Sequence, residues 1–375
     1  MARRGRRRRF LLHTVVIALA GLPFLAVGLD LLAPSVGLPL TLAAIALLQL
    51  PALVELTSLG RERPGDPLTL AGWHAFYALW VGAIVYSVAA GLTRLALLGA
   101  GASVAAAAPP AVWLALAPFA MAGWGVVVGQ RRTPREQQQL RVVGLPAGLA
   151  GLKVVQLSDL HLGRFFGEGR LEKLVARARE AQPDLVVVTG DLVDDSARFA
   201  PLAARLLATI EAPLGVFVCL GNHDHHAGAA EVTAALQASG IRVLRNEGLL
   251  LTHGGASLWL CGVDDLWFGG DLDAALAHKP EGVPALLLSH QPALFPEAAR
   301  RGVALTLSGH THAGQIALPF FPQASLARLI TPFVVGRYER GGSLLYVNRG
   351  AGAIRPLVRL GAPPEVAVLT LQPAA

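Results

Sequence analysis

Residues 152–161 read Leu-Lys-Val-Val-Gln-Leu-Ser-Asp-Leu-His. A short run of β-branched and apolar residues, too short for a helix, stops there at a turn that carries Asp159 and His161. The arrangement recurs further along the chain: Leu185–Thr189 precedes Gly190-Asp191, Val216–Leu220 precedes Gly221-Asn222-His223-Asp224, Leu286–Leu288 precedes Ser289-His290, and Ala304–Leu307 precedes Ser308-Gly309-His310-Thr311-His312. These runs predict short strands that each end in a polar turn.

Helical stretches lie between the predicted strands. In residues 170–181 the apolar side chains recur at i, i+3, i+4 and i+7, which gives a helix with one apolar face. Residues 201–210 and 229–238 are weaker, alanine-rich candidates. Alternation of strands and helices predicts an α/β fold, in which the carboxyl ends of the strands meet at one edge and bind ligands.

The polar turns carry side chains that bind divalent metal ions. Carboxylate, amide and imidazole ligands without thiolates suit Mn, Fe or Zn ions. The candidates are Asp159, His161, Asp191, Asn222, His290, His310 and His312. They are too many for one ion that takes about four to six ligands, and they suit two ions bridged by a carboxylate. Each motif alone is equally typical of a turn, a helix cap or a core histidine, so the prediction depends on the ordered set.

The N-terminal third of the chain is apolar. The 375-residue sequence is 53% hydrophobic, and ionisable residues are sparse before position 130. Four segments, residues 10–32, 38–59, 70–90 and 108–129, each reach the ~20 residues that an α-helix needs to cross a bilayer. We therefore expect an α-helical transmembrane region of about four spans. A transporter would place ionisable residues inside the spans, but most of those present lie near the predicted ends or loops.

The basic residues orient this region. Six arginines lie among the first nine residues, and the formal net charge is +7. Arginines before an apolar run favour a cytoplasmic N-terminus over a nucleic-acid footprint, so no specific nucleic-acid partner is expected. The resulting organisation is a basic cytoplasmic N-terminus at 1–9, a transmembrane region at 10–130, a linker at 131–150 and a catalytic domain at 151–375 that faces the cytoplasm. A twin-arginine export signal or a three-span topology would place the domain outside.

The ordered motifs D-x-H, G-D, G-N-H-D, H and G-H-x-H resemble the calcineurin-like metallophosphoesterase superfamily over about residues 151–372. Within it the chain is most similar to the membrane-associated YkuE/YaeI-type bacterial phosphodiesterases, on residues 157–162, 262–265, 288–292, 307–315 and 363–366. Ala313 stands where that branch usually has a glycine. The resemblance implies two packed β-sheets flanked by helices.

The resemblance also implies the role of each site residue. One metal ion would be held by Asp159, His161, Asp191 and His312, and the second by Asp191, Asn222, His290 and His310, with Asp191 as the bridge. His223 matches the catalytic histidine of the family and would protonate or stabilise the leaving oxygen. Asp224 would orient the His223 imidazole. A hydroxide bridging the two metals would attack phosphorus in line.

The expected function is therefore that of a multi-pass, membrane-anchored binuclear phosphohydrolase, a phosphodiesterase or pyrophosphatase. Its membrane location suggests a lipid-linked substrate. The alternatives are a non-catalytic scaffold with the same fold and an outward-facing cell-envelope phosphodiesterase. Arg164, Arg349 and Arg355 are candidates for holding a phosphate. The pair Phe165-Phe166 either lines an acyl-chain groove or packs beneath its loop.

Overall fold

The computed structural model describes residues 67–101, 111–130, 133–318, 321–355 and 357–374. The chain divides into two units between Val128 and Gly129. Each unit is described by itself.

The N-terminal unit contains two apolar helices, α5 (Pro67–Gly99) and α6 (Ala111–Trp124), and α6 continues as a π-helical turn, η2 (Gly125–Gly129). Among the described residues, one stretch, His74–Gly99, is long and apolar enough to cross a membrane. The apolar helix Ala117–Gly129 is shorter. Two of the four predicted spans, 10–32 and 38–59, lie outside the described residues, so the multi-pass topology stays a prediction.

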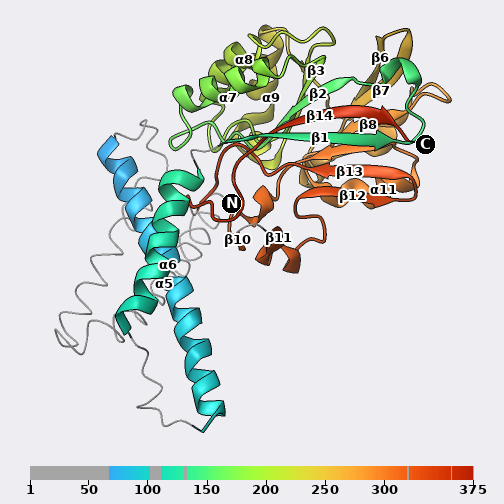
Figure 1. The fold of residues 1–375 in the computed structure, drawn as a ribbon. Helices are drawn as coiled ribbons and strands as arrows, with labels where there is room; N and C mark the ends of the chain where they lie inside the picture. The colour runs from blue at the N-terminus through green and yellow to red at the C-terminus, as the bar shows by residue number, and fades with distance from the viewer. Residues whose placement is uncertain (1–66, 102–110, 131–132, 319–320, 356, 375) are drawn as a thin grey trace, which may run out of the picture. The chain divides into compact units, whose positions relative to one another are not determined.

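The C-terminal unit is built on two six-stranded sheets (Figure 1). The first has the order β1 (Arg135–Val142), β14 (Val366–Pro373), β2 (Lys153–Leu157), β3 (Leu185–Thr189), β4 (Val216–Cys219) and β5 (Arg242–Val243). The second has the order β12 (Gly336–Arg340), β13 (Ser343–Val347), β9 (Leu305–Ser308), β8 (Ala285–Leu288), β7 (Ala256–Gly262) and β6 (Glu247–His253). Strands β10 (Ala317–Leu318) and β11 (Phe321–Ser325) pair antiparallel in a separate two-stranded sheet.

Helices cover both sheets. The longer helices are α7 (Glu168–Glu180), α8 (Ala200–Leu207) and α9 (Asn222–Ala238), and the shorter ones are α10 (Leu272–Leu276) and α11 (Phe295–Arg300). Single 3-10 turns occur at η3 (Ala147–Leu149), η4 (Ala197–Phe199), η5 (Leu266–Phe268), η6 (Pro292–Leu294), η7 (His312–Gly314) and η8 (Leu326–Leu329). The predicted α/β fold with two packed sheets flanked by helices is confirmed.

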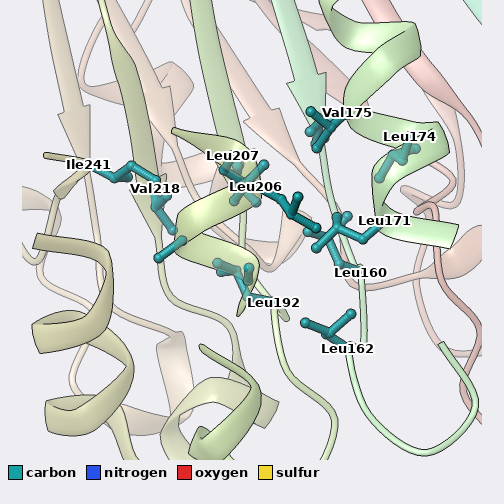
Figure 2. Close-up of a cluster of buried hydrophobic side chains, with 14 of the residues drawn as sticks. Leu160, Leu162, Leu171, Leu174, Val175, Leu192, Leu206, Leu207, Val218 and Ile241 are labelled. Atoms are coloured by element: carbon teal, nitrogen blue, oxygen red, sulfur yellow. The ribbon is translucent and has the colours of Figure 1, made fainter. Parts of the chain in front are cut away.

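Apolar side chains fill three layers. Helices α7, α8 and α9 pack on the outer face of the first sheet, where Leu171, Leu207 and Val218 lie in one buried cluster (Figure 2). A second cluster fills the space between the two sheets. A third, around Trp259 and Leu272, lies on the outer face of the second sheet. Because each sheet is covered on both faces, its central strands are apolar without alternation, which makes them recognisable in the sequence.

The five predicted strands all form, as β2, β3, β4, β8 and β9. Strands β2, β3 and β4 are parallel neighbours in the first sheet, and β8 and β9 are parallel neighbours in the second. The buried Gln156 links the two sheets at this end, because its Nε2 donates to the Ser308 carbonyl at 3.0 Å and to Thr189 Oγ1 at 2.9 Å. The two sheets therefore deliver their polar turns to one place.

The predicted linker at residues 131–150 is wrong in its central part. Residues 135–142 form strand β1, which pairs in parallel with β14. Leu140 and Val142 are buried in the core between the sheets. The other residues of this edge strand are polar and at least partly exposed, so its composition matches that of a linker. The compact unit accordingly begins at Gly129 rather than at residue 151.

Candidate metal centre

The site lies in the turns that follow β2, β3, β4, β8 and β9. Five of the seven predicted ligands have a left-handed backbone: φ is 52° at Asp159, 47° at His161, 53° at Asp191, 70° at His310 and 51° at His312. Such angles are uncommon outside glycine, and Asp and His are among the side chains that tolerate them best. Clusters of strained residues of this kind are characteristic of functional sites.

One group of side chains surrounds His161 and His312. Their Nε2 atoms are 3.1 Å apart. His312 Nε2 lies 3.2 Å from Asp159 Oδ1, and His161 Nε2 lies 3.6 Å from Asp191 Oδ2. All four residues are almost fully buried. These are the residues predicted to hold the first ion.

A second group surrounds His290. Its Nε2 lies 3.2 Å from Asp191 Oδ2 and 3.2 Å from His310 Nδ1. Asn222 begins helix α9, and its side-chain oxygen is buried without a hydrogen bond from any described residue. These are the residues predicted to hold the second ion.

The donor set fits divalent cations. In each of the two groups, two imidazole nitrogens face each other beside a carboxylate oxygen. The buried amide oxygen of Asn222 accepts no hydrogen bond from the described residues. A buried polar atom without a partner destabilises a fold unless something else satisfies it, and a bound cation would satisfy this one. The absence of cysteine from the site matches the preference for Mn, Fe or Zn with oxygen and nitrogen ligands.

Glycines let the backbone approach the ligands closely. A Cβ at Gly221 would collide with the Asp191 carboxylate, and a Cβ at Gly309 would collide with Ser158 Oγ and the Asp159 carboxylate. The glycines in the G-N-H-D and G-H-x-H motifs therefore have a steric role beside the ligands.

Outer contacts hold the ligands in place. Ser158 Oγ donates to Asp159 Oδ2 at 2.6 Å, and the His310 backbone N–H donates to the same carboxylate. His290 Nδ1 contacts the Thr189 carbonyl at 2.8 Å, which leaves its Nε2 for the site. The fully buried Arg359 places its guanidinium 3.0 Å from His312 Nδ1. Such contacts orient metal ligands and tune their affinity.

The charges of the site favour a cation. Burial opposes the charged form of Asp191, but the charges of His290, His161 and His223 outweigh it and hold the pKa of Asp191 well below its usual range. Burial likewise opposes the imidazolium of His290, but the Asp191 and Asp159 carboxylates raise its pKa to about 10. Burial and the charge of His290 lower the pKa of His310. The carboxylates thus attract positive charge to the centre of the site.

His223 lies beside the first group, with its ring centroid 4.7 Å from that of His161. Its Nδ1 is 2.8 Å from the Asp194 carbonyl and 3.4 Å from Asp194 Oδ1. Burial opposes its imidazolium, but the contacts with Asp194 and the charge of Asp191 raise the pKa of His223 to about 9. In the metal-free site these contacts favour the imidazolium of His223, the form that a proton donor requires.

The structure places Asp194, and not the predicted Asp224, against the His223 imidazole. Asp224 accepts hydrogen bonds from the backbone N–H groups of Leu192, Val193 and Gly221. Both His223 and Asp224 are in helix α9, where consecutive side chains point in different directions. Asp194 also lies 3.6 Å from His161 Nδ1, so one carboxylate faces both imidazoles. The acidic pair Asp194-Asp195 shortly after Asp191 was the available sequence signal.

Two other residues that the sequence singled out, Arg349 for phosphate binding and Phe166 for an acyl-chain groove, have structural contacts instead. Arg349 pairs with Glu365 at 2.6 Å and with Glu136 at 2.8 Å, so its charge stabilises the fold. Phe166 is 3% exposed and belongs to the core of the first sheet, which supports packing rather than an acyl-chain groove. Arg355 lies closer to the site, with its guanidinium 3.9 Å from Asp194 Oδ2.

Comparison with known proteins gives consistent matches. Residues 152–314 match the sequence model of the calcineurin-like phosphoesterases. An uncharacterized metallophosphoesterase of Bacillus subtilis, YkuE, is 36% identical over 61% of this chain and 82% of its own length. An uncharacterized metallophosphoesterase of Aquifex aeolicus is 33% identical over 63% of this chain and 91% of its own length. A zebrafish (Danio rerio) protein, named a transmembrane protein with metallophosphoesterase domain, is 33% identical over 68% of this chain and 61% of its own length.

Proposed function

The chain belongs to the calcineurin-like phosphoesterase family, and from that premise we propose that it is a two-metal phosphodiesterase or pyrophosphatase anchored in a membrane. Membership makes it a hydrolase of phosphoric esters. The number of ions, the kind of ester and the anchoring are the proposal.

The observation that carries the proposal is the position of Asp191 Oδ2. This atom lies 3.6 Å from His161 Nε2 in the first group and 3.2 Å from His290 Nε2 in the second. The other carboxylate oxygen, Oδ1, accepts the His223 backbone N–H at 2.9 Å. One oxygen that faces both groups is the arrangement that a bridging ligand needs, and two-metal sites use such bridges to hold ions ~3.5–4 Å apart.

The mechanism assigns separate tasks to the protein and the ions. When bound, two divalent ions lower the pKa of water and offset the negative charge that develops during attack at phosphorus. His223 supplies the proton for the leaving oxygen. Its Nδ1 donates to the Asp194 carbonyl, so Nε2 is the nitrogen that holds the transferable proton. The Asp194 carboxylate keeps this imidazole charged, and its contact with His161 Nδ1 orients that ligand.

The membrane location is supported by the apolar stretch His74–Gly99 and by relatives whose names describe them as transmembrane proteins. A substrate linked to a lipid would be within reach of such an enzyme. The arginines of the first nine residues favour a domain that faces the cytoplasm. A reporter fused to the C-terminus tests this topology: signal from the outer side of the membrane would refute it.

A matched pair of histidine variants tests the proposed activity. The full chain, reconstituted in lipid nanodiscs with Mn²⁺, should hydrolyse bis(p-nitrophenyl) phosphate. His290→Gln should lower kcat/KM by more than about 100-fold, because it removes a ligand rather than an outer contact. His278→Gln, at an exposed position, should leave the rate unchanged. Absence of turnover by the wild type with Mn, Fe and Zn ions would refute the proposal and favour a binding scaffold.

A further inference from the structure

An aromatic pair lies at the edge of the metal centre and has no part in the mechanism above. Trp267 and Phe268 lie in the 3-10 turn η5, in the loop after β7. Trp267 is 65% exposed, yet its ring centroid is only 5.6 Å from that of His310. Phe268 stacks on His225 at 4.5 Å and meets His226 edge-on at 5.1 Å. An exposed indole beside a predicted metal ligand is available to a bound molecule.

The backbone of this loop is held on both sides. Asp265 accepts hydrogen bonds from the backbone N–H of Trp267 and from the side chain of Gln291, the residue after His290. Asn246 accepts from the N–H groups of Asp264 and Asp271, at the two ends of the loop. Trp267 is therefore exposed on a fixed support. Recognition residues are typically placed in this way, because little entropy is then lost when a ligand binds.

The surroundings of Trp267 indicate the kind of group it would contact. Its indole meets the imidazole of His310, and the adjacent Phe268 meets the imidazoles of His225 and His226. Acyl-chain sites are lined mainly by hydrophobic side chains. Exposed aromatic rings beside polar groups suit stacking with a base or another flat ring, whose faces are apolar and whose edges are polar.

We propose that Trp267 is a specificity-determining residue that stacks against an aromatic ring or base carried by the substrate, so that the preferred substrates are aryl or nucleoside phosphoesters. This proposal rests on the proposed hydrolysis. Phe268, the next residue, packs against the imidazoles of His225 and His226, which hold the turn that carries Trp267. The metal centre acts on the phosphorus, and Trp267 selects what is attached to it.

A series of p-nitrophenyl phosphodiesters tests the proposal, because all members share one leaving group. The second substituent is methyl, octyl, phenyl or thymidine 5′-yl, and the enzyme is the full chain loaded with Mn²⁺. Trp267→Ala should lower kcat/KM for the phenyl and thymidine esters by roughly 5- to 30-fold. The methyl ester should change by less than about 2-fold, since its second substituent offers no ring. Trp267→Phe should retain the preference, and Trp267→Leu should lose it.

Two results would overturn the proposal. An equal loss for all four esters would show that Trp267 does not select the second substituent, and a loss confined to the octyl ester would show that it contacts an acyl chain. Phe321→Ala, which removes an exposed aromatic ring outside this loop, serves as the control. A separate binding measurement distinguishes failure of this stacking proposal from failure of the proposed hydrolysis. Thymidine 5′-monophosphate should quench tryptophan emission in the wild type and not in Trp267→Phe, even if no ester is hydrolysed. Equal quenching in both proteins would contradict the stacking contact.

Discussion

Replacing Asp194 by asparagine separates proton donation from metal binding. The rise in the pKa of His223 from 6.5 to about 9 corresponds to about 3 kcal/mol of preference for the imidazolium. Asp194 and Asp191 share this effect. Asp194→Asn removes the carboxylate charge 3.4 Å from His223 Nδ1 but keeps the backbone carbonyl at 2.8 Å. We therefore expect the pKa of His223 to fall to between about 7 and 8.

The sign of the change predicts its pH dependence. A lower pKa leaves His223 neutral under alkaline conditions, so the variant loses its proton donor at high pH and keeps it at low pH. For a dialkyl phosphodiester, whose alkoxide must be protonated, kcat should fall by roughly 3- to 25-fold near about pH 8.5. Near about pH 6 it should fall by less than about 2-fold. p-Nitrophenolate leaves without a proton, so an ester that releases it should be nearly unaffected.

Phosphorus NMR of the dialkyl ester and absorbance of the nitrophenyl ester measure both rates across this pH range. The control is Asp195→Asn, because Asp195 is the exposed neighbour of Asp194, and it should behave as the wild type. The reasoning is refuted if Asp194→Asn slows both esters equally at every pH. Such a result, with a lower metal content, would show that Asp194 acts through His161 instead.

Three further predictions concern stability, each measured by thermal or chemical unfolding. Asp224→Asn should lower Tm by roughly 3–8 °C, because an amide cannot accept all three backbone hydrogen bonds. The kcat of the folded, metal-loaded protein should stay within about 3-fold of the wild type. A shift in the pH profile of kcat would show instead that Asp224 has a catalytic role. The raised pKa values of His223 and His290, about 9 and about 10, stabilise the metal-free fold fully below about pH 6.5, and this contribution is lost as pH rises through those values. Stabilisation by Mn²⁺ should grow over the same range, since the ligands must lose their protons; a pH-independent Mn²⁺ effect would contradict this. Ala313→Gly should change the free energy of unfolding by less than about 1 kcal/mol. Glycine relieves the strain of the left-handed backbone at this position (φ 52°), and this gain offsets the loss of a buried methyl group and the higher entropy of the unfolded chain. A larger change would show that one of these effects dominates.

The sequence predicts the central strands and the ligand set because both depend on local pattern. Runs such as residues 185–189 are buried on both faces, so they are apolar throughout. The polar turn after each of these runs can then be identified without knowledge of the tertiary fold. The amphipathic helix α7 was predicted on the same basis, and its apolar positions are buried.

Features that depend on tertiary contacts were missed. Strand β1 is a partly exposed edge strand, so its residues look like those of a linker. Asp194 reaches His223 only because the turn after β3 packs against the start of α9. Its sequence position identifies an acidic residue but not its partner. The exposure of Trp267 beside His310 likewise depends on how the β7 loop packs against the turn after β9.

The bridging position of Asp191 is the centre of this account, and metal stoichiometry tests it most directly. Elemental mass spectrometry of the full chain, purified without chelator and equilibrated with Mn²⁺, should find two ions per chain. Asp191→Asn weakens the ligand that both groups share and should leave at most one ion, whereas Asp195→Asn should retain two. One ion in the wild type, or two in Asp191→Asn, would contradict a binuclear centre bridged by Asp191.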